Sequence, residues 1–354
     1  MPPIIVIEDR YSCTKPMGLF ASMLRCEGKK SAFTHLVIIL CTACYLTINI
    51  FSSKKNSTFE VFNAYFRSTG ATLHIIWLLI LFSKRYQLKY VSLIDLFKAK
   101  TRCNLDSCEI RRHLVVNRKI ATFVYLIIPF LLPIHNLCYS ILISLQTSHY
   151  DQLMSKLVFG VLEILTYLSF QLYNQFLFES CLHIQACWLT VEDHIRSLEN
   201  IERLTITKLR KCRSMYSIAA ATTQKMDSFL QFPLFNFYSC LFTAFQLNLV
   251  INCHEPTTVG IIRISIQFLH MAFTTFNMVY INYLSNQCFD HVHSLSYKTR
   301  SLPINNEVQL FIDRIEHSKV GFSFLKISLI TPTFVTSMAS LTLTIALSAP
   351  TLFF

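Results

Sequence analysis

Residues 321–349, GFSFLKISLITPTFVTSMASLTLTIALSA, form the last apolar stretch of the chain and decide how the rest is interpreted. The stretch is long enough to cross a membrane, which takes roughly 20 apolar residues. It nevertheless contains ten Ser and Thr residues, a charge at Lys326 and a proline at Pro332. A helix that only sits in lipid needs none of these. They favour a helix that faces other helices or a water-filled path.

The composition of the whole chain is typical of a membrane protein. Of its 354 residues 53% are hydrophobic and 15% are charged, whereas soluble domains carry about 25% charged residues. Seven segments qualify as membrane spans: 32–51, 70–82, 120–145, 157–178, 229–251, 259–284 and 320–347. The second of them, 70–82, is short and reaches full length only by including residues 61–66 across Arg67.

The distribution of Lys and Arg predicts the orientation of these spans, because basic residues near span ends resist translocation. Twenty-six lie in the amino tail and in the loops after spans two, four and six, and four lie in the opposite loops. We therefore expect a cytoplasmic tail at 1–31, a seven-helix domain at 32–349 and an extracellular tail at 350–354. The net charge of +12 is spread between apolar runs, so we expect no nucleic-acid partner.

Two chemical features follow from this topology. The sequon at Asn56 falls in the first outer loop, where it is a predicted glycosylation site. Of thirteen cysteines, only Cys253 lies clearly outside, so we expect no disulfide framework. An inverted topology would, in contrast, expose five other cysteines to oxidation: Cys103, Cys108, Cys181, Cys187 and Cys212.

The first apolar run begins too late in the chain and is too long for a cleaved signal peptide.

Two long cytoplasmic connections, 180–227 and 285–319, are predicted to continue the spans as helices below the membrane. Pro303 divides the second connection into two helical pieces. Apolar faces on water-exposed helices must be buried, so we expect these extensions to form an anchor bundle. In the first connection, 180–227, apolar residues recur at roughly helical spacing: Leu189, Ile195, Leu198, Ile201, Leu204 and Leu209.

The chain resembles the insect gustatory and odorant receptor superfamily. The stretch LRKCRSMYSIAAATTQKMDSFLQFPLFNFY at 209–238 is similar to the family's entry into span five, and residues 311–347 are similar to its carboxyl-terminal signature. Gustatory members carry Thr-Tyr, five apolar residues and Gln-Phe in the last span. Here those positions hold Ala339-Ser340 and Ala346-Leu347, which marks a divergent member.

The resemblance implies an all-α channel subunit that assembles as a homo- or hetero-tetramer in the plasma membrane and is opened by a small molecule. The last span would line a cation pore. Pro332 would split or kink that span, with Lys326 at the cytoplasmic level and the pore helix after it. Ile345 and Leu347 are candidates for an apolar gate. The predicted pore-lining residues are Thr333, Thr336, Ser337, Ser340, Thr344, Ile345, Leu347 and Ser348.

The resemblance also implies a ligand pocket in the outer half of the bundle, bounded by spans two to six. Polar groups inside spans are costly and mark functional positions, and Glu163 is the most costly of them. Apolar and aromatic walls with a few polar groups suit a small organic ligand. The predicted ligand-binding residues are His74, Trp77, His135, Asn136, Tyr139, Glu163, Tyr167, Phe170, Gln267 and His270.

Several alternatives remain open from the sequence. The hydroxyl residues could serve ordinary helix packing, and Glu163 could pair with a polar neighbour to satisfy the bundle. The chain could be a metabotropic seven-helix receptor, or a divergent relative with a non-chemosensory role. Phosphate-loop and nucleophile motifs are absent from the sequence, so we expect neither an enzyme nor a cofactor. Two sets have only loose zinc spacing, and we expect no metal: Cys181, His183 and Cys187, and Cys288, His291 and His293.

Overall fold

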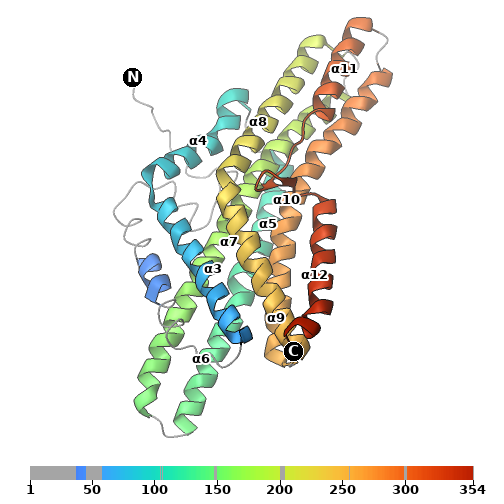
Figure 1. Cartoon of the computed structure of the whole chain (residues 1–354). Coiled ribbons are helices and arrows are strands. Elements are labelled where there is room, and N and C mark those ends of the chain that lie inside the picture. Colours follow the sequence, from blue (N-terminus) through green and yellow to red (C-terminus); the bar gives the residue numbers. More distant parts are fainter. Residues whose placement is uncertain are drawn as a thin grey trace.

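The computed structural model describes residues 37–44, 58–103, 105, 107–146, 150–199, 204–254, 256–298 and 301–353. These residues form a bundle of long helices with one short β-hairpin (Figure 1). Three predictions lie largely outside the described residues: the tail at 1–31, most of the first span, and Asn56. Residues 37–44, inside the predicted first span, are helical.

The second predicted span belongs to α3, which runs over Thr58–Phe82 and includes the segment across Arg67. A further helix, α4 (Lys84–Thr101), occupies what was expected to be a loop. Its buried side chains recur at i, i+3, i+4 and i+7, the spacing of one helical face. They are Tyr90, Leu93, Ile94 and Phe97.

The middle of the bundle consists of helices that reach far beyond the predicted spans. The third span lies within α5 (Cys108–Thr122), the π-helical turn η1 (Phe123–Ile127) and α6 (Ile128–Gln146), which follow one another without a break. The chain returns along α7 (Tyr150–Glu199), a single helix of 50 residues.

The carboxyl-terminal half repeats this design. Helix α8 (Ile206–Phe237), the π-helical turn η2 (Tyr238–Phe242) and α9 (Thr243–His254) run continuously, and α10 (Thr258–Lys298) runs beside α7. Helix α11 (Leu302–Glu316) packs back on α10 and α8. The connections predicted as helical extensions therefore are helices, and Pro303 lies at the start of α11.

Four helical stretches of the described chain are long and apolar enough to cross a membrane: Cys108–His135, Met154–Glu199, Ile206–Cys253 and Thr258–Lys298. Two shorter apolar helices, Ser68–Leu81 and Pro332–Ser348, match the second and last predicted spans. The chain is therefore a helical membrane protein.

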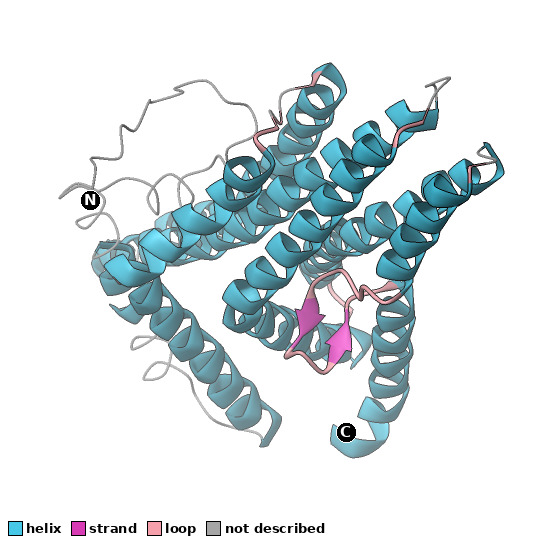
Figure 2. Cartoon of the chain, turned by 90° about the horizontal axis from the view of Figure 1, so that it is seen from above, coloured by secondary structure: helices cyan, strands magenta, loops and turns pink. Residues whose placement is uncertain are grey.

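The last predicted span, 320–347, is wrong as a single helix. Its first part is a two-stranded antiparallel hairpin, β1 (Ser323–Phe324) and β2 (Ser328–Leu329), and helix α12 starts at Pro332 and ends at Phe353 (Figure 2). Pro332 therefore begins a helix and does not kink one, and a proline in the first turn sacrifices no hydrogen bond. Lys326 lies in the hairpin turn, apart from α12 as expected.

Candidate functional site

Helix α12 packs against the rest of the bundle through one of its faces. Gln246 of α9 donates a hydrogen bond to the Thr342 hydroxyl at 2.8 Å. Phe334, in the first turns of α12, packs edge-on against Tyr238 at a ring distance of 5.6 Å. Met338 is half-buried on the same side, because residues four apart share a helical face.

Most hydroxyl residues of α12 lie on a different face, which is exposed in the single chain. Their hydroxyls donate to carbonyl oxygens of the preceding turn at 2.7 to 3.0 Å, at Thr336, Ser337, Thr344 and Ser348. Such backbone bonding leaves the oxygen lone pairs able to accept from water or from another helix. Five of the predicted pore residues are exposed there: Thr333, Thr336, Ser337, Ser340 and Thr344.

The two gate candidates lie differently. Leu347 is 71% exposed, on the side of the hydroxyl stripe. Ile345 is half-buried and follows Met338 and Thr342 at i+7 and i+3, on the face that packs against the bundle. Ser348 is also half-buried. Leu347 is therefore better placed than Ile345 to meet a neighbouring helix.

The hairpin before α12 is fastened to the bundle by polar contacts. The Asp227 carboxylate of α8 accepts from the Ser323 backbone N–H and from its hydroxyl, both at 2.7 Å. Asn282 of α10 donates to the Val320 carbonyl at 2.8 Å. The hairpin turn holds Leu325 and Lys326 at φ 53° and 59°, a left-handed conformation that costs a non-glycine residue about 1–2 kcal/mol.

Three of the predicted ligand-binding residues meet between α3 and α7. The His74 ring stacks on Phe170 with centroids 3.8 Å apart, and its Nε2 is 3.0 Å from the Ser169 hydroxyl. Trp77 packs edge-on against Tyr173 at 6.0 Å. His74 and Trp77 are fully buried, so aromatic surface encloses this contact.

This contact contains buried polar atoms without a hydrogen-bond partner in the described structure: Nδ1 of His74, Nε1 of Trp77 and the Thr166 hydroxyl. Leaving such a group unsatisfied costs about 1–3 kcal/mol. A bound molecule that carries an oxygen could accept from the Trp77 indole and meet the free imidazole nitrogen. Three of the predicted ligand-binding residues therefore lie together at the α3–α7 contact, beside these unpartnered atoms.

The other predicted ligand-binding residues lie elsewhere. His270 Nε2 is 2.7 Å from the Val124 carbonyl of η1, and Asn248 donates to Gln267 at 3.0 Å. Tyr167 lies within electrostatic range of both Glu163 and Arg263. His135 is exposed. The side chains of Asn136 and Tyr139 lie outside the described part of the structure.

Sequence reasoning missed several residues of these contacts. The Tyr125 hydroxyl is 2.5 Å from Thr274, and the Tyr238 hydroxyl is 2.9 Å from the adjacent Thr275. Both π-helical turns are thus tied to consecutive residues of α10. Hydroxyl residues inside apolar runs give no sequence signal, because Ser and Thr are tolerated in any membrane helix. One helical spacing was visible, since Thr166, Ser169, Phe170 and Tyr173 lie at i, i+3, i+4 and i+7.

No group of three or more His, Cys, Asp or Glu residues is arranged to hold a metal ion among the described residues. The residues with loose zinc spacing make other contacts. His291 Nδ1 is 3.0 Å from Glu199, and the Cys288 thiol faces the Leu284 carbonyl at 3.5 Å. Cys181 and Cys187 are buried among apolar side chains.

No protein-family model matches the sequence, and no curated protein matches it. The structure matches the insect olfactory receptor OR5 from Machilis hrabei in complex with eugenol, with a TM-score of 0.60 and 13% identity over 91% of this chain and 88% of that one. A second structure of OR5 matches with a TM-score of 0.55 and 12% identity, over 91% and 89% of the two chains. These neighbours are receptors and not enzymes. The chain thus has the fold of the insect olfactory receptors, as its resemblance implied.

Proposed function

We propose that this protein is a subunit of a ligand-gated cation channel of the plasma membrane, and that the channel detects small organic molecules. The observation that carries the proposal is the exposed hydroxyl face of α12, which lies apart from the face packed on α9. Hydroxyl groups give a water-filled path polar partners without fixed charge. In an assembly of four chains around one axis, this face would line the pore.

The fold supports the same proposal. One receptor of this fold has a solved structure in complex with eugenol. We propose that this chain likewise binds a small organic ligand in the outer half of its helix bundle. The groups that would meet it are the stacked His74 and Phe170, the Trp77 indole and the Thr166 hydroxyl. The predicted orientation, amino terminus inside and carboxyl terminus outside, belongs to this proposal.

The hairpin gives a route from ligand to pore. Ligand binding opens a channel only if the ligand interacts differently with the closed and the open state. Helices α8 and α10 hold the hairpin through Asp227 and Asn282, and α12 follows two residues after β2. A shift of α8 or α10 would thereby displace the start of α12.

Cysteine accessibility tests the pore assignment. In cells that express the protein with Cys253→Ser as background, we expect Ser340→Cys to make whole-cell current sensitive to a membrane-impermeant, charged thiol reagent. Ala339→Cys is the matched control, because Ala339 is also exposed in the single chain but lies about 100° round the helix. Equal sensitivity or equal resistance of the two variants would contradict the pore face.

A ligand-independent test measures assembly. We expect the purified protein in lipid nanodiscs to have the mass of four chains, with Ser340→Cys forming inter-chain disulfides on mild oxidation and Ala339→Cys not. Monomers whose α12 contacts only lipid would overturn the proposal. An epitope tag at the amino terminus that antibodies label on intact cells would overturn the orientation and favour the metabotropic alternative.

A further inference from the structure

A cavity of about 390 Å³ lies at the other end of the bundle from the predicted ligand pocket. Three elements line it: the start of α5, the far part of α7 and the middle of α10. In the predicted topology it opens to the cytoplasm beside the inner membrane surface. None of the predicted site residues lines it.

The cavity is acidic in a basic protein. Glu109, Glu192 and Asp193 line it together with a single guanidinium, Arg196, so its formal charge is −2 with His113 neutral. The chain as a whole carries +12. A hollow of the opposite sign concentrates cations from the surrounding solution.

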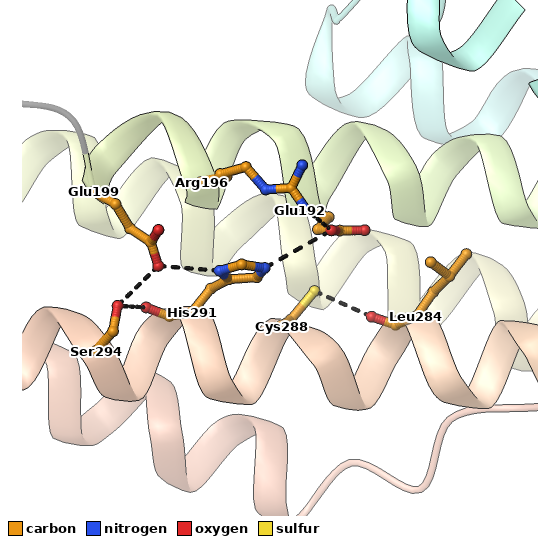
Figure 3. Close-up of polar contacts among 7 residues, drawn as sticks. All are labelled: Glu192, Arg196, Glu199, Leu284, Cys288, His291 and Ser294. Atoms are coloured by element: carbon orange, nitrogen blue, oxygen red, sulfur yellow. Dashed lines mark hydrogen bonds and ion pairs between the residues drawn. The ribbon is translucent and has the colours of Figure 1, made fainter. Parts of the chain in front are cut away.

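The charge on Glu192 is already compensated within the protein. Arg196 Nη2 lies 2.5 Å from its Oε1, and His291 Nε2 lies 3.8 Å from the same oxygen (Figure 3). Glu109 and Asp193 are exposed at the surface of the cavity. These two carboxylates therefore supply the charge that an incoming cation would meet.

One wall of the cavity is aromatic. The rings of His113 and Tyr280 are stacked with centroids 5.8 Å apart, and those of Tyr280 and Tyr283 are also stacked at 5.8 Å. Tyr283 is 55% exposed. Aromatic faces attract ammonium groups, and they do so best for alkylated cations that give up their hydration shell easily. Carboxylates beside aromatic rings are the usual surroundings of such a ligand.

We propose that this cavity binds an organic ammonium group. Carboxylates supply the charge, and the tyrosine rings select a substituted ammonium over sodium or potassium. The same chemistry occurs in a free cytoplasmic amine and in the choline or ethanolamine headgroup of an inner-leaflet lipid. The proposal does not depend on channel activity.

The position of the cavity links it to α12. Tyr283, which lines the cavity, directly follows Asn282, which donates to the Val320 carbonyl before the hairpin. A ligand on Tyr283 therefore acts on the same turn of α10 that holds the hairpin. A ligand in the cavity would change how far the start of α12 can move, and it would act from the cytoplasmic side of the predicted topology.

Equilibrium binding of radiolabelled choline to the purified full chain, in nanodiscs of phosphatidylglycerol, tests the proposal. We expect saturable binding that unlabelled tetramethylammonium displaces and an equal concentration of sodium does not. Asp193→Asn and Tyr283→Leu should each weaken it about tenfold, within the range of a cation–π contact. Asp290→Asn and Tyr297→Leu, exposed positions on α10 outside the cavity, should leave it unchanged.

Nanodiscs of phosphatidylcholine separate the two sources of the ammonium group. If a lipid headgroup fills the cavity, choline binding should disappear in phosphatidylcholine, and native mass spectrometry should show retained lipid on the parent chain but not on Tyr283→Leu. If a free amine fills it, binding should be equal in both lipids. Absence of saturable binding in phosphatidylglycerol, or equal binding by cavity variants and controls, would overturn the proposal.

Discussion

The Asp227 carboxylate holds Ser323 by two hydrogen bonds at 2.7 Å, one from the backbone N–H and one from the hydroxyl. The two residues are 96 positions apart. This contact joins α8 to the hairpin that precedes α12, and Asn282 of α10 holds the same segment through the Val320 carbonyl.

The first prediction concerns this contact. Asp227→Ala leaves the Ser323 N–H without its acceptor, so we expect the free energy of unfolding to fall by about 1–3 kcal/mol. Ser323→Ala removes only the hydroxyl bond and should cost less, about 1 kcal/mol. Thermal unfolding of the purified variants measures both. Because the two residues share the contact, the double variant should cost less than the sum of the single changes. Additive losses would contradict the arrangement.

The second prediction concerns the hairpin turn. A β-turn with positive φ at both central positions usually holds Asn-Gly there, but in this three-residue loop, 325–327, those positions hold Leu325 and Lys326. Lys326→Gly should raise the free energy of unfolding by about 1 kcal/mol relative to Lys326→Ala, which removes the same charge but keeps the strain. Equal unfolding midpoints for the two variants would mean that the turn is not strained.

The third prediction concerns the unsatisfied atoms between α3 and α7. His74→Phe keeps a ring to stack on Phe170 and removes the unpartnered nitrogen. The change also removes the contact of His74 Nε2 with the Ser169 hydroxyl. We therefore expect the variant to unfold close to the temperature of the parent chain, because the loss of this hydrogen bond offsets the gain from deleting the unpaired nitrogen. If this contact binds the ligand, the same variant should lose ligand-evoked current. Retained ligand sensitivity in a stable variant would place the ligand elsewhere.

Much of the helical architecture could be predicted from the sequence. The apolar positions in 180–227 repeat at helical spacing, and α7 and α8 are long continuous helices as expected. Helix α4 was equally visible in the spacing of Tyr90, Leu93, Ile94 and Phe97. It was missed because the ten basic residues of the loop after span two, five of which lie in α4, were used only to predict topology.

The hairpin could not be predicted. Residues 320–331 are apolar and precede a helix, so length alone favoured one long span. Leu325-Lys326 gives no turn signal, and Asp227, whose carboxylate holds the first strand of the hairpin, is distant in sequence. Tertiary contacts of this kind override local preference.

The candidate site was predictable in part. His74, Trp77 and Phe170 do meet, because their positions inside spans two and four place them on facing helices. His270 and Gln267 lie elsewhere, since depth along a helix says nothing of which neighbour the side chain faces. The acidic cavity combines residues of three distant segments, and no single segment carries a recognisable motif for it.

The fourth prediction concerns charges inside the bundle. Tyr167 lies within electrostatic range of Glu163 and Arg263, which places an acid and a base near each other on α7 and α10. Glu163→Gln should lower stability because it removes a negative charge that shares the surroundings of Tyr167 with Arg263. Adding Arg263→Gln should restore part of the loss, with a coupling energy of about 0.5–3 kcal/mol. Independent effects of the two changes would show that Glu163 is balanced by another group.

The fifth prediction concerns pH and the contact between the ends of α7 and α10. Burial raises the pKa of Glu199, but hydrogen bonds from Ser294 and His291 outweigh it, so the net pKa is below the ordinary value of 4.5. A carboxyl whose pKa is lowered on folding stabilises the protein above its unfolded pKa and loses that contribution as the pH falls through the folded pKa. The parent chain should therefore unfold at a higher temperature than Glu199→Gln at pH 7 and at pH 5, and the difference should shrink below pH 4.5. Exposed Glu316 on α11 provides the matched control, because Glu316→Gln should show no such difference at any of these pH values. If the difference in unfolding temperature between the parent chain and Glu199→Gln persists below pH 4.5, the side-chain packing of Glu199, and not its charge, stabilises the contact between the two helices.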